Sequence, residues 1–267
     1  MVRRTTLFSL AALALVAVGA IGFGVANIAP LDVLAIIGKS LFGLPVGSDI
    51  SAGATSIVMD IRLPRILAAI AVGAALATSG AAFQSLLRNP LADPYVLGTS
   101  SGAALGAAIA FLVPITGVAW ELGGVQLAAF VGALASVALV WRIAGVGSGE
   151  ERIASVLLVG YAVASLLAAA LSLVMLASGA NLRAIFSFLL GGLDGVTWPR
   201  LAAAAIPIAL ATLLLARRGR ALAAFLLGDE GATHLGIDVR RDTKVPLEFE
   251  VSHVSFIFFL DALRNLR

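Results

Sequence analysis

Cysteine is absent from this sequence, and charged residues are scarce. Without cysteine the chain can form neither a disulfide nor a thiolate metal site, so cysteine usage leaves the redox compartment open. Asp, Glu, Lys and Arg make up 12% of the 267 residues, whereas soluble domains carry about a quarter. A mean hydropathy of +1.05 with 60% apolar residues indicates a protein of the lipid bilayer.

Several long runs contain no Asp, Glu, Lys, Arg or His. These runs are Thr5–Leu31, Ile66–Leu87, Tyr95–Trp120, Leu122–Trp141, Ile153–Leu182 and Leu201–Ala216. Most exceed the roughly 20 residues that a helix needs to cross a hydrocarbon core of about 30 Å. The short last run is flanked by Trp198 and by basic residues from Arg217 onward, which can anchor it at both interfaces. We therefore predict an all-α polytopic membrane protein with about six transmembrane helices.

The absence of ionisable groups from these runs argues against a proton-driven transporter, because such carriers keep titrating residues in mid-membrane. Sodium held by backbone carbonyls would escape this test. The polar side chains that could line a path are Gln84, Thr78, Ser79, Thr99, Ser100 and Ser101. Each hydroxyl can equally well bond to its own helix backbone.

Basic residues predict the orientation. With Arg3 and Arg4 in the cytoplasm, the inner loops carry about twice as many Lys and Arg as the outer loops, as the positive-inside rule requires. The chain is then a multi-pass protein of the cytoplasmic membrane with a cytoplasmic amino terminus, and Leu31–Asp60 is an external loop. The first run is longer than the core of a signal peptide, so we expect an uncleaved span. Because the basic residues are scattered, we expect no nucleic-acid partner.

Two polar islands interrupt the apolar sequence. In "LLRNPLADPYVLG" (Leu86–Gly98) the prolines should end the preceding helix at Arg88 and place Asn89 and Asp93 in extended or turn conformations. In "LLGDEGATHLGIDVRR" (Leu226–Arg241), Asp229 should cap a short helix that Gly236 ends in a left-handed conformation. Local chemistry leaves open whether this second island is a passive loop or a docking element for a partner.

Rows of small residues predict close helix packing. Gly98, Gly102 and Gly106 recur at every fourth position, and Gly73, Ala77 and Ala81 do the same in the preceding span. We expect both spans to be interior, since small residues let helix backbones approach in lipid.

Two fragments that are typical of nucleotide-binding enzymes lack the required context. "GKS" at Gly38–Ser40 has Val33 where the phosphate-binding loop needs glycine, and "FLLGDE" at Phe225–Glu230 has no α/β domain around it. We expect that the chain is not an enzyme and does not hydrolyse ATP.

The stretches Ile57–Ala107, Phe188–Trp198 and Leu226–Arg241 together resemble the permease subunits of type II ABC importers, which take up iron-siderophores, haem and cobalamin. The resemblance covers Met1 to about Arg241 and implies the amino-terminal part of a larger permease of about ten helices. It implies a second permease copy, as homodimer or heterodimer, two cytoplasmic ABC ATPase subunits and an extracytoplasmic substrate-binding protein. It also implies that the chain binds no cofactor and that the partner subunit uses ATP.

The resemblance also assigns candidate site residues. The ATPase-coupling loop of the family matches Gly228, Asp229, Glu230, Gly231, Ala232, Leu235 and Gly236. The family's turn after the second span matches "RNPLADP". Arg62 and Arg65 match the family's "RLPR" at the entry to that span. Candidates for the translocation path or a hinge are Gln84, Arg88, Asn89, Pro90, Asp93, Pro94, Gly98, Ser101 and Gly102. No residue is a candidate metal ligand.

The sequence departs from the family after the coupling loop. All 28 glycines precede Asp242, and residues 242–267 contain a single alanine. We expect residues 1–241 to form an incomplete permease domain and residues 242–267 to be an atypical, frameshifted or substituted tail. The alternatives to an importer permease are a secondary transporter or channel subunit and a non-functional truncated permease.

Overall fold

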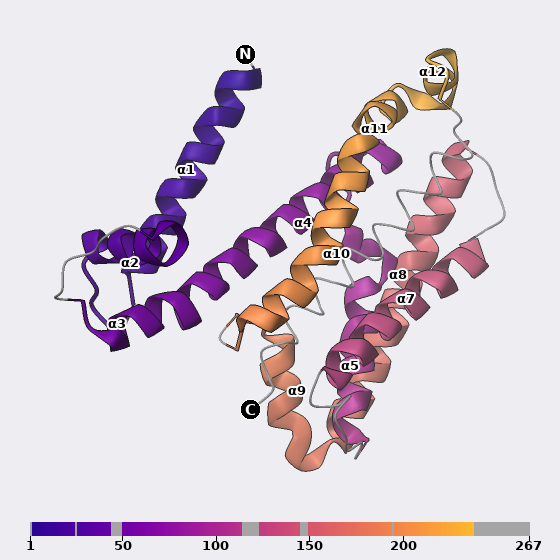
Figure 1. Cartoon of the computed structure of the whole chain (residues 1–267). Coiled ribbons are helices and arrows are strands. Elements are labelled where there is room, and N and C mark those ends of the chain that lie inside the picture. The colour runs from indigo at the N-terminus through magenta and orange to yellow at the C-terminus, as the bar shows by residue number, and fades with distance from the viewer. Residues whose placement is uncertain are drawn as a thin grey trace. The chain divides into compact units, whose positions relative to one another are not determined.

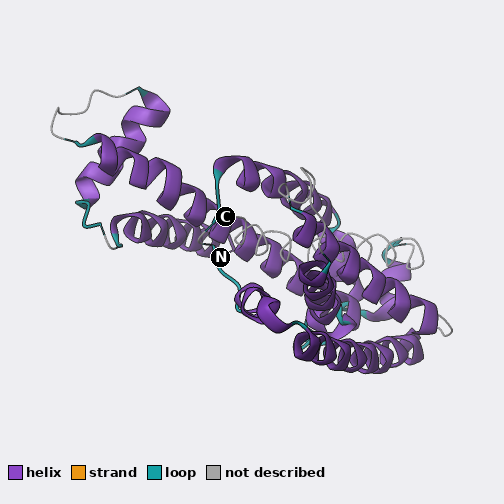
Figure 2. Cartoon of the chain, turned by 90° about the horizontal axis from the view of Figure 1, so that it is seen from below, coloured by secondary structure: helices purple, strands orange, loops and turns teal. Residues whose placement is uncertain are grey.

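The computed structural model describes residues 2–24, 26–43, 50–113, 123–144, 149–193 and 195–237, and the regular structure within these ranges is helical (Figure 2). The α-helices are α1 (Val2–Gly22), α2 (Pro30–Phe42), α3 (Ala52–Ser56), α4 (Leu63–Leu87), α5 (Thr99–Leu112), α7 (Gly124–Ala144), α8 (Gly149–Ala177), α9 (Leu182–Leu189), α10 (Trp198–Arg217), α11 (Gly219–Phe225) and α12 (Gly228–His234) (Figure 1). A π-helix, η1 (Ile57–Arg62), precedes α4, and two 3-10 helices are η2 (Pro94–Leu97) and η3 (Gly179–Asn181). The prediction of an all-α protein is confirmed.

Contacts divide the chain into two units. The first unit comprises residues 1–70 with 196–201, and the second comprises residues 71–195 with the chain from 202 onward.

Five helical segments of the described chain are long and apolar enough to cross a membrane. They are Arg4–Gly22, Ala52–Leu87, Gly124–Ala144, Ala154–Ala177 and Trp198–Arg217. These segments correspond to five of the six predicted spans. The third predicted span is represented by the 14 residues of α5, and residues 114–120 of its charge-free run lie outside the described residues.

The segment Leu31–Asp60, predicted to be an external loop, is not irregular, because much of it is helical; its side of the membrane stays a prediction. Pro30 begins α2, and Gly43 ends it in a left-handed conformation with φ of 66°. Ser51 caps α3, its Oγ accepting a hydrogen bond from Ala54 N over 3.1 Å. These are ordinary helix start and stop signals, and the polar composition of the segment concealed them.

Just before Pro64 the helix has the wider π register of η1. The Leu63 N–H donates to the carbonyl of Val58, five residues earlier, in place of Met59. In that register the donor for the Met59 carbonyl would be Pro64, which has no N–H. The indole Nε1 of Trp198 donates to the Met59 carbonyl instead, over 2.9 Å. The Trp198 side chain at the start of α10 therefore supplies the hydrogen bond that Pro64 cannot donate within the helix.

Arg62 closes the end of α1 within the first unit. Its Nη1 donates to the carbonyl of Ile21 over 2.6 Å and to that of Gly22 over 3.1 Å, and its Nη2 donates to the carbonyl of Ala26. Carbonyls in the last turn of a helix have no partner within that helix. A Cβ added to Gly24 would lie 2.6 Å from Nη2, so a larger residue there would require the guanidinium to shift.

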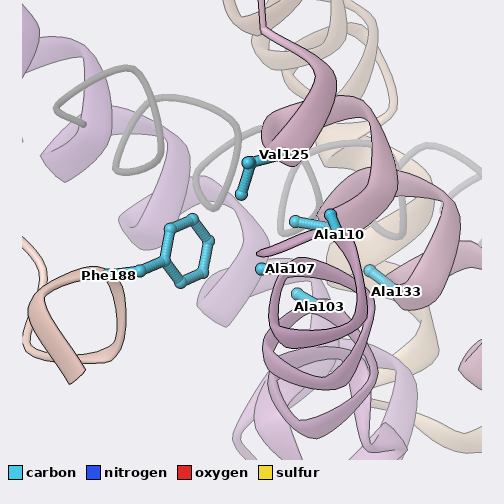
Figure 3. Close-up of a cluster of buried hydrophobic side chains, with 7 residues drawn as sticks. Ala103, Ala107, Ala110, Val125, Ala133 and Phe188 are labelled. Atoms are coloured by element: carbon cyan, nitrogen blue, oxygen red, sulfur yellow. The ribbon is translucent and has the colours of Figure 1, made fainter. Parts of the chain in front are cut away.

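In the second unit α5 packs closely against α7, as its glycine row predicts. A Cβ added to Gly102 would lie 2.5 Å from the carbonyl oxygen of Gly132, and one added to Gly106 would overlap the carbonyl oxygen of Ala128. Figure 3 shows the cluster beside this contact, in which Ala103, Ala107, Ala110 and Ala133 lie with Val125 and Phe188. Without side chains at the crossing, the two backbones come into direct contact.

The second small-residue row does not lie where we predicted. Gly73, Ala77 and Ala81 are exposed in the single chain, and α4 buries Ala75 and Ala82 instead. Ala75 packs against Ala204 and Ile208 of α10. The spacing of small residues identifies a helix that can pack closely, but it does not say which face has a neighbour.

The glycine crossing predicts a large effect from one methyl group. We expect Gly102→Ala to lower the free energy of unfolding by about 1–3 kcal/mol, because the new Cβ must displace the backbone of α7. Thermal unfolding of the purified chain in detergent, followed by circular dichroism, measures the loss. Gly73→Ala is the matched control: nothing lies within 4 Å of its added Cβ, so it should leave the melting temperature unchanged or raise it. Equal effects of the two changes would contradict the close contact.

The Arg62 contacts predict a second loss of stability. We expect Arg62→Ala to lower the free energy of unfolding by about 1.5–3 kcal/mol or more, because several carbonyls lose their donor. This range is that of one hydrogen bond to a charged group. The same unfolding measurement applies. Arg4→Ala, which removes an exposed arginine from α1, should change the stability by less than about 0.5 kcal/mol. If both arginines behave alike, Arg62 does not hold the end of α1.

Candidate functional site

The two polar islands meet in the second unit of the structure. Arg88, directly after α4, donates from Nε to the carbonyl of Phe225, the last residue of α11, over 3.0 Å. Beside this bond Leu86 is buried in a cluster with Ala224, Phe225 and Ala232. We call Arg88–Gly98 the 88–98 turn and Gly228–Gly236 the α12 element. The candidate site is formed where the 88–98 turn contacts α11 and the α12 element.

The end of α4 has the hydrogen bonds of a Schellman motif. Asn89 N donates to the carbonyl of Gln84 over 3.1 Å, and Arg88 N approaches that of Ser85 at 3.4 Å. Arg88 itself has φ of 51°, in the left-handed region that glycine normally fills at this position of the motif. The conformation costs a residue with a Cβ about 1–2 kcal/mol. The helix end predicted at Arg88 is confirmed to within one residue, since α4 ends at Leu87.

Side chains fix the turn that follows. Asn89 accepts a hydrogen bond at Oδ1 from Leu91 N over 2.9 Å and at its carbonyl from Ala92 N over 3.0 Å. Gln84 Nε2 donates to the carbonyl of Pro90 over 3.0 Å. Proline with asparagine before it favours such a turn, and the side-chain bonds make it a defined bend.

The turn then enters α5 through η2. Asp93 is extended, as predicted, and its Oδ1 accepts a hydrogen bond from Tyr95 N over 2.9 Å, with Pro94 at the first position of η2. Gly98 has φ of 72°, and its added Cβ would lie 3.0 Å from Ser136 Oγ and 3.3 Å from Ala164. Ser136 Oγ also donates to the buried carbonyl of Leu97 over 3.0 Å. The end of the bend is therefore held by α7 and α8.

The predicted cap of the α12 element is wrong and its predicted end is confirmed. The residue before α12 is Leu227, which makes no side-chain capping bond, and Asp229 lies inside the first turn. Gly228 has φ of 89° and supplies the change of direction that a cap would otherwise mark. At the other end Gly236 has φ of 76°; its N donates to Thr233 O over 2.9 Å, and Ile237 N donates to Ala232 O over 3.1 Å.

The α12 element has an inner and an outer face. Ala232 is fully buried against Leu86 and Phe225, whereas Glu230, Leu235 and Gly236 are exposed. Gly228 and Gly231 are half-buried, and the side chain of Asp229 lies outside the described residues. The inner face fixes the element to the protein, and the outer face presents a carboxylate beside an apolar side chain.

The candidates for a translocation path occupy different surroundings. Gln84 is exposed, Ser101 is half-buried and Gly102 is buried against α7. Thr78 Oγ1 donates to the carbonyl of Ala74 over 2.7 Å, so this hydroxyl serves its own helix. Ser79 is fully buried. Within the described residues, no group of three or more His, Cys, Asp or Glu could hold a metal ion.

Sequence reasoning missed Leu86, Phe225 and Ser136, which hold the candidate site together. Phe225 is 137 positions from Arg88 in the chain, and Leu86 and Ser136 lie within ordinary apolar helices. The composition around these residues does not distinguish them from their neighbours. Only the two polar islands, after Leu87 and after Phe225, marked the region.

Comparison with known proteins gives consistent matches. Residues 9–249 match the FecCD transport family. A cobalamin import system permease from Halobacterium salinarum is 39% identical over 206 residues, which are 77% of this chain and 54% of that protein. A hemin transport system permease from Yersinia pestis is 37% identical over 185 residues, covering 68% of this chain and 55% of the relative.

The fold has a solved counterpart. An inward-facing structure, assigned to the metal-chelate type of ABC transporter, superposes with a TM-score of 0.78 and 24% identity, over 96% of this chain and 76% of that one. At this identity the likeness concerns the fold alone. The chain spans about half the length of the curated relatives it matches. The extent of the family match, the identities and the permease fold together show that this chain belongs to the FecCD transport family.

Proposed function

We propose that the chain is a transmembrane permease subunit of an ATP-driven importer in the cytoplasmic membrane, with a metal chelate of the siderophore, haem or cobalamin type as substrate. The observation that carries the proposal is the α12 element, a short helix fixed on its inner face and exposed on its outer face, in a chain of the FecCD family. The cobalamin and hemin permeases among its relatives support this class of substrate.

The α12 element is the docking element for a cytoplasmic ABC ATPase. Glu230 and Leu235 on its outer face offer a charged and an apolar contact, and both are exposed. The two ends of α12 are set by glycines in left-handed conformations, so the short helix keeps its shape without a long supporting segment. The ATPase binds and hydrolyses ATP, and the permease itself carries no cofactor.

The substrate path lies between this chain and a second permease copy, identical or related. An external binding protein delivers the chelate, and the 88–98 turn joins two helices of the path as a fixed bend. The hydrogen bonds of Asn89, Asp93 and Gln84 support the rigidity of that bend. The charge-free runs give the chain no titrating group in mid-membrane, so transport draws on the ATPase rather than on protons.

Recovery of a partner ATPase tests the docking element. The tagged chain is co-expressed with ABC ATPases of its source organism, and the bound ATPase is measured by its vanadate-sensitive hydrolysis. We expect Glu230→Lys combined with Leu235→Asp to reduce the recovered ATPase at least about tenfold, a loss of about 1.4 kcal/mol or more. Arg142→Glu, an equally large charge change at the exposed end of α7, should leave recovery unchanged.

Uptake measurements decide between classes of transporter. Labelled cobalamin, ferric siderophore and haem are offered to cells that express the chain with the ATPase. We expect uptake of one of these chelates to follow ATP and to survive a protonophore. Uptake that collapses with the ion gradient and needs no ATPase would identify a secondary carrier and overturn the proposal.

Thiol labelling tests the orientation, because the chain contains no native cysteine. We expect a cysteine placed by Glu230→Cys to resist a membrane-impermeant maleimide in intact spheroplasts and to react in inverted vesicles. Gly53→Cys, at an exposed position of α3 on the predicted external side, should show the opposite pattern. Labelling of residue 230 from outside would invalidate both the orientation and the docking role.

A further inference from the structure

Two helices at the candidate site end in the same backbone motif, but with different residues. The left-handed position after α12 is Gly236, with φ of 76°, and the corresponding position after α4 is Arg88, with φ of 51°. Glycine adopts this conformation without steric conflict, whereas arginine does not. The arginine at the end of α4 therefore needs a favourable contribution from its side chain, and the contacts of the guanidinium supply one.

The Arg88 side chain connects two helix ends and lies beside the start of a third helix. Its backbone belongs to the end of α4, and its Nε donates to the Phe225 carbonyl at the end of α11 over 3.0 Å. Carbonyls at a helix carboxyl terminus carry partial negative charge and lack partners within the helix, so a cation is favoured there. Nη1 also lies 3.8 Å from the position of an added Cβ on Gly228, where α12 begins.

The apolar contacts beneath this bond join the same elements. Leu86 of α4 is buried with Ala224 and Phe225 of α11 and with Ala232 of α12. Ile237, after α12, packs against this cluster. The polar bond thus joins the end of α4 to α11, and the buried cluster joins it to both α11 and α12.

We propose that Arg88 is a positioning residue that ties the α12 element to the end of α4, so that displacement of α12 by a docked ATPase is passed to α4 and to the 88–98 turn. The proposal rests on the function proposed above, since it needs a partner that displaces α12. Arg88 acts through the Phe225 carbonyl and need not contact the substrate or the ATPase.

Because the backbone of Arg88 is left-handed, three substitutions separate the role of its side chain from the role of its backbone. Arg88→Gly removes the side chain and relieves the left-handed backbone, whereas Arg88→Ala removes the side chain and keeps the strain. Arg88→Lys retains a positive donor that can reach a carbonyl, but it lacks the Nε–H used here. If Arg88 served only the backbone, glycine would be the best replacement. If its side chain provides the link, lysine should be.

A distance measurement tests the link without any partner. Spin labels are attached to the full chain in lipid nanodiscs by Leu91→Cys and His234→Cys, two exposed positions on the 88–98 turn and on α12. We expect one narrow distance distribution with Arg88, a broad one with both Arg88→Ala and Arg88→Gly, and a narrower one again with Arg88→Lys. Arg142→Ala, at an exposed site elsewhere in the same unit, should leave the distribution unchanged.

Coupling is then measured in proteoliposomes with the recovered ATPase. We expect Arg88→Ala and Arg88→Gly to lower the chelate transported per ATP hydrolysed roughly tenfold, within the usual range of coupling between sites, while the ATPase remains bound. Arg88→Lys should recover part of this ratio. A merely structural loss would reduce ATPase binding and transport together and would leave their ratio intact.

The outcomes separate this inference from the function on which it rests. Unchanged distances in Arg88→Ala, or full transport per ATP in Arg88→Gly, overturn the role of Arg88. If no ATPase binds the unaltered chain, the proposed function fails, whereas the distance measurement still decides whether Arg88 holds α12 to α4.

Discussion

A backbone polar group that is removed from water must find a partner within the protein, and in a bilayer this requirement governs every place where a helix stops. At three places the described chain meets it with side chains that come from elsewhere in the sequence. Arg62 donates hydrogen bonds to carbonyls at the end of α1. Trp198 donates to the Met59 carbonyl, which Pro64 leaves without a backbone donor. Arg88 takes the carbonyl of Phe225. These polar side chains lie at the interruptions of the helices that they complete.

This constraint also explains why the polar islands carry the candidate function. A helix that ends in a hydrogen-bonded turn transmits displacement, because the turn cannot relax without breaking several bonds at once. The 88–98 turn has such bonds at Asn89 and Asp93, and its last residue is packed against α7 and α8. Arg88 joins this turn to the end of α11, and the cluster around Leu86 joins the end of α4 to the α12 element. A movement that begins at the exposed face of α12 therefore has a continuous packed route to α4.

The sequence predicted features that depend on local chemistry. Charge-free runs predicted five of the six spans, the prolines predicted the end of α4 to within one residue, and Gly236 predicted the end of α12. It failed where the neighbours of a residue decide the outcome. Nothing local shows that Gly73 faces outward while Gly102 is buried against α7, or that Arg88 meets Phe225 across 137 positions. The cap at Asp229 was wrong because Gly228 provides the change of direction by its backbone alone.

The length of the second span determines where its charged residues can lie. The helical stretch Ala52–Leu87 has 36 residues, about 54 Å at 1.5 Å per residue, which exceeds a hydrocarbon core of about 30 Å. Asp60, Arg62 and Arg65 lie in its first half, and the charge-free part from Ile66 to Leu87 is by itself about 33 Å long. The charged part can therefore stay at or beyond the interface while the apolar part crosses. Under the proposed function, displacement reaches α4 at its carboxyl-terminal end, where Arg88 donates to the Phe225 carbonyl of α11 and Leu86 packs with Ala232 of α12.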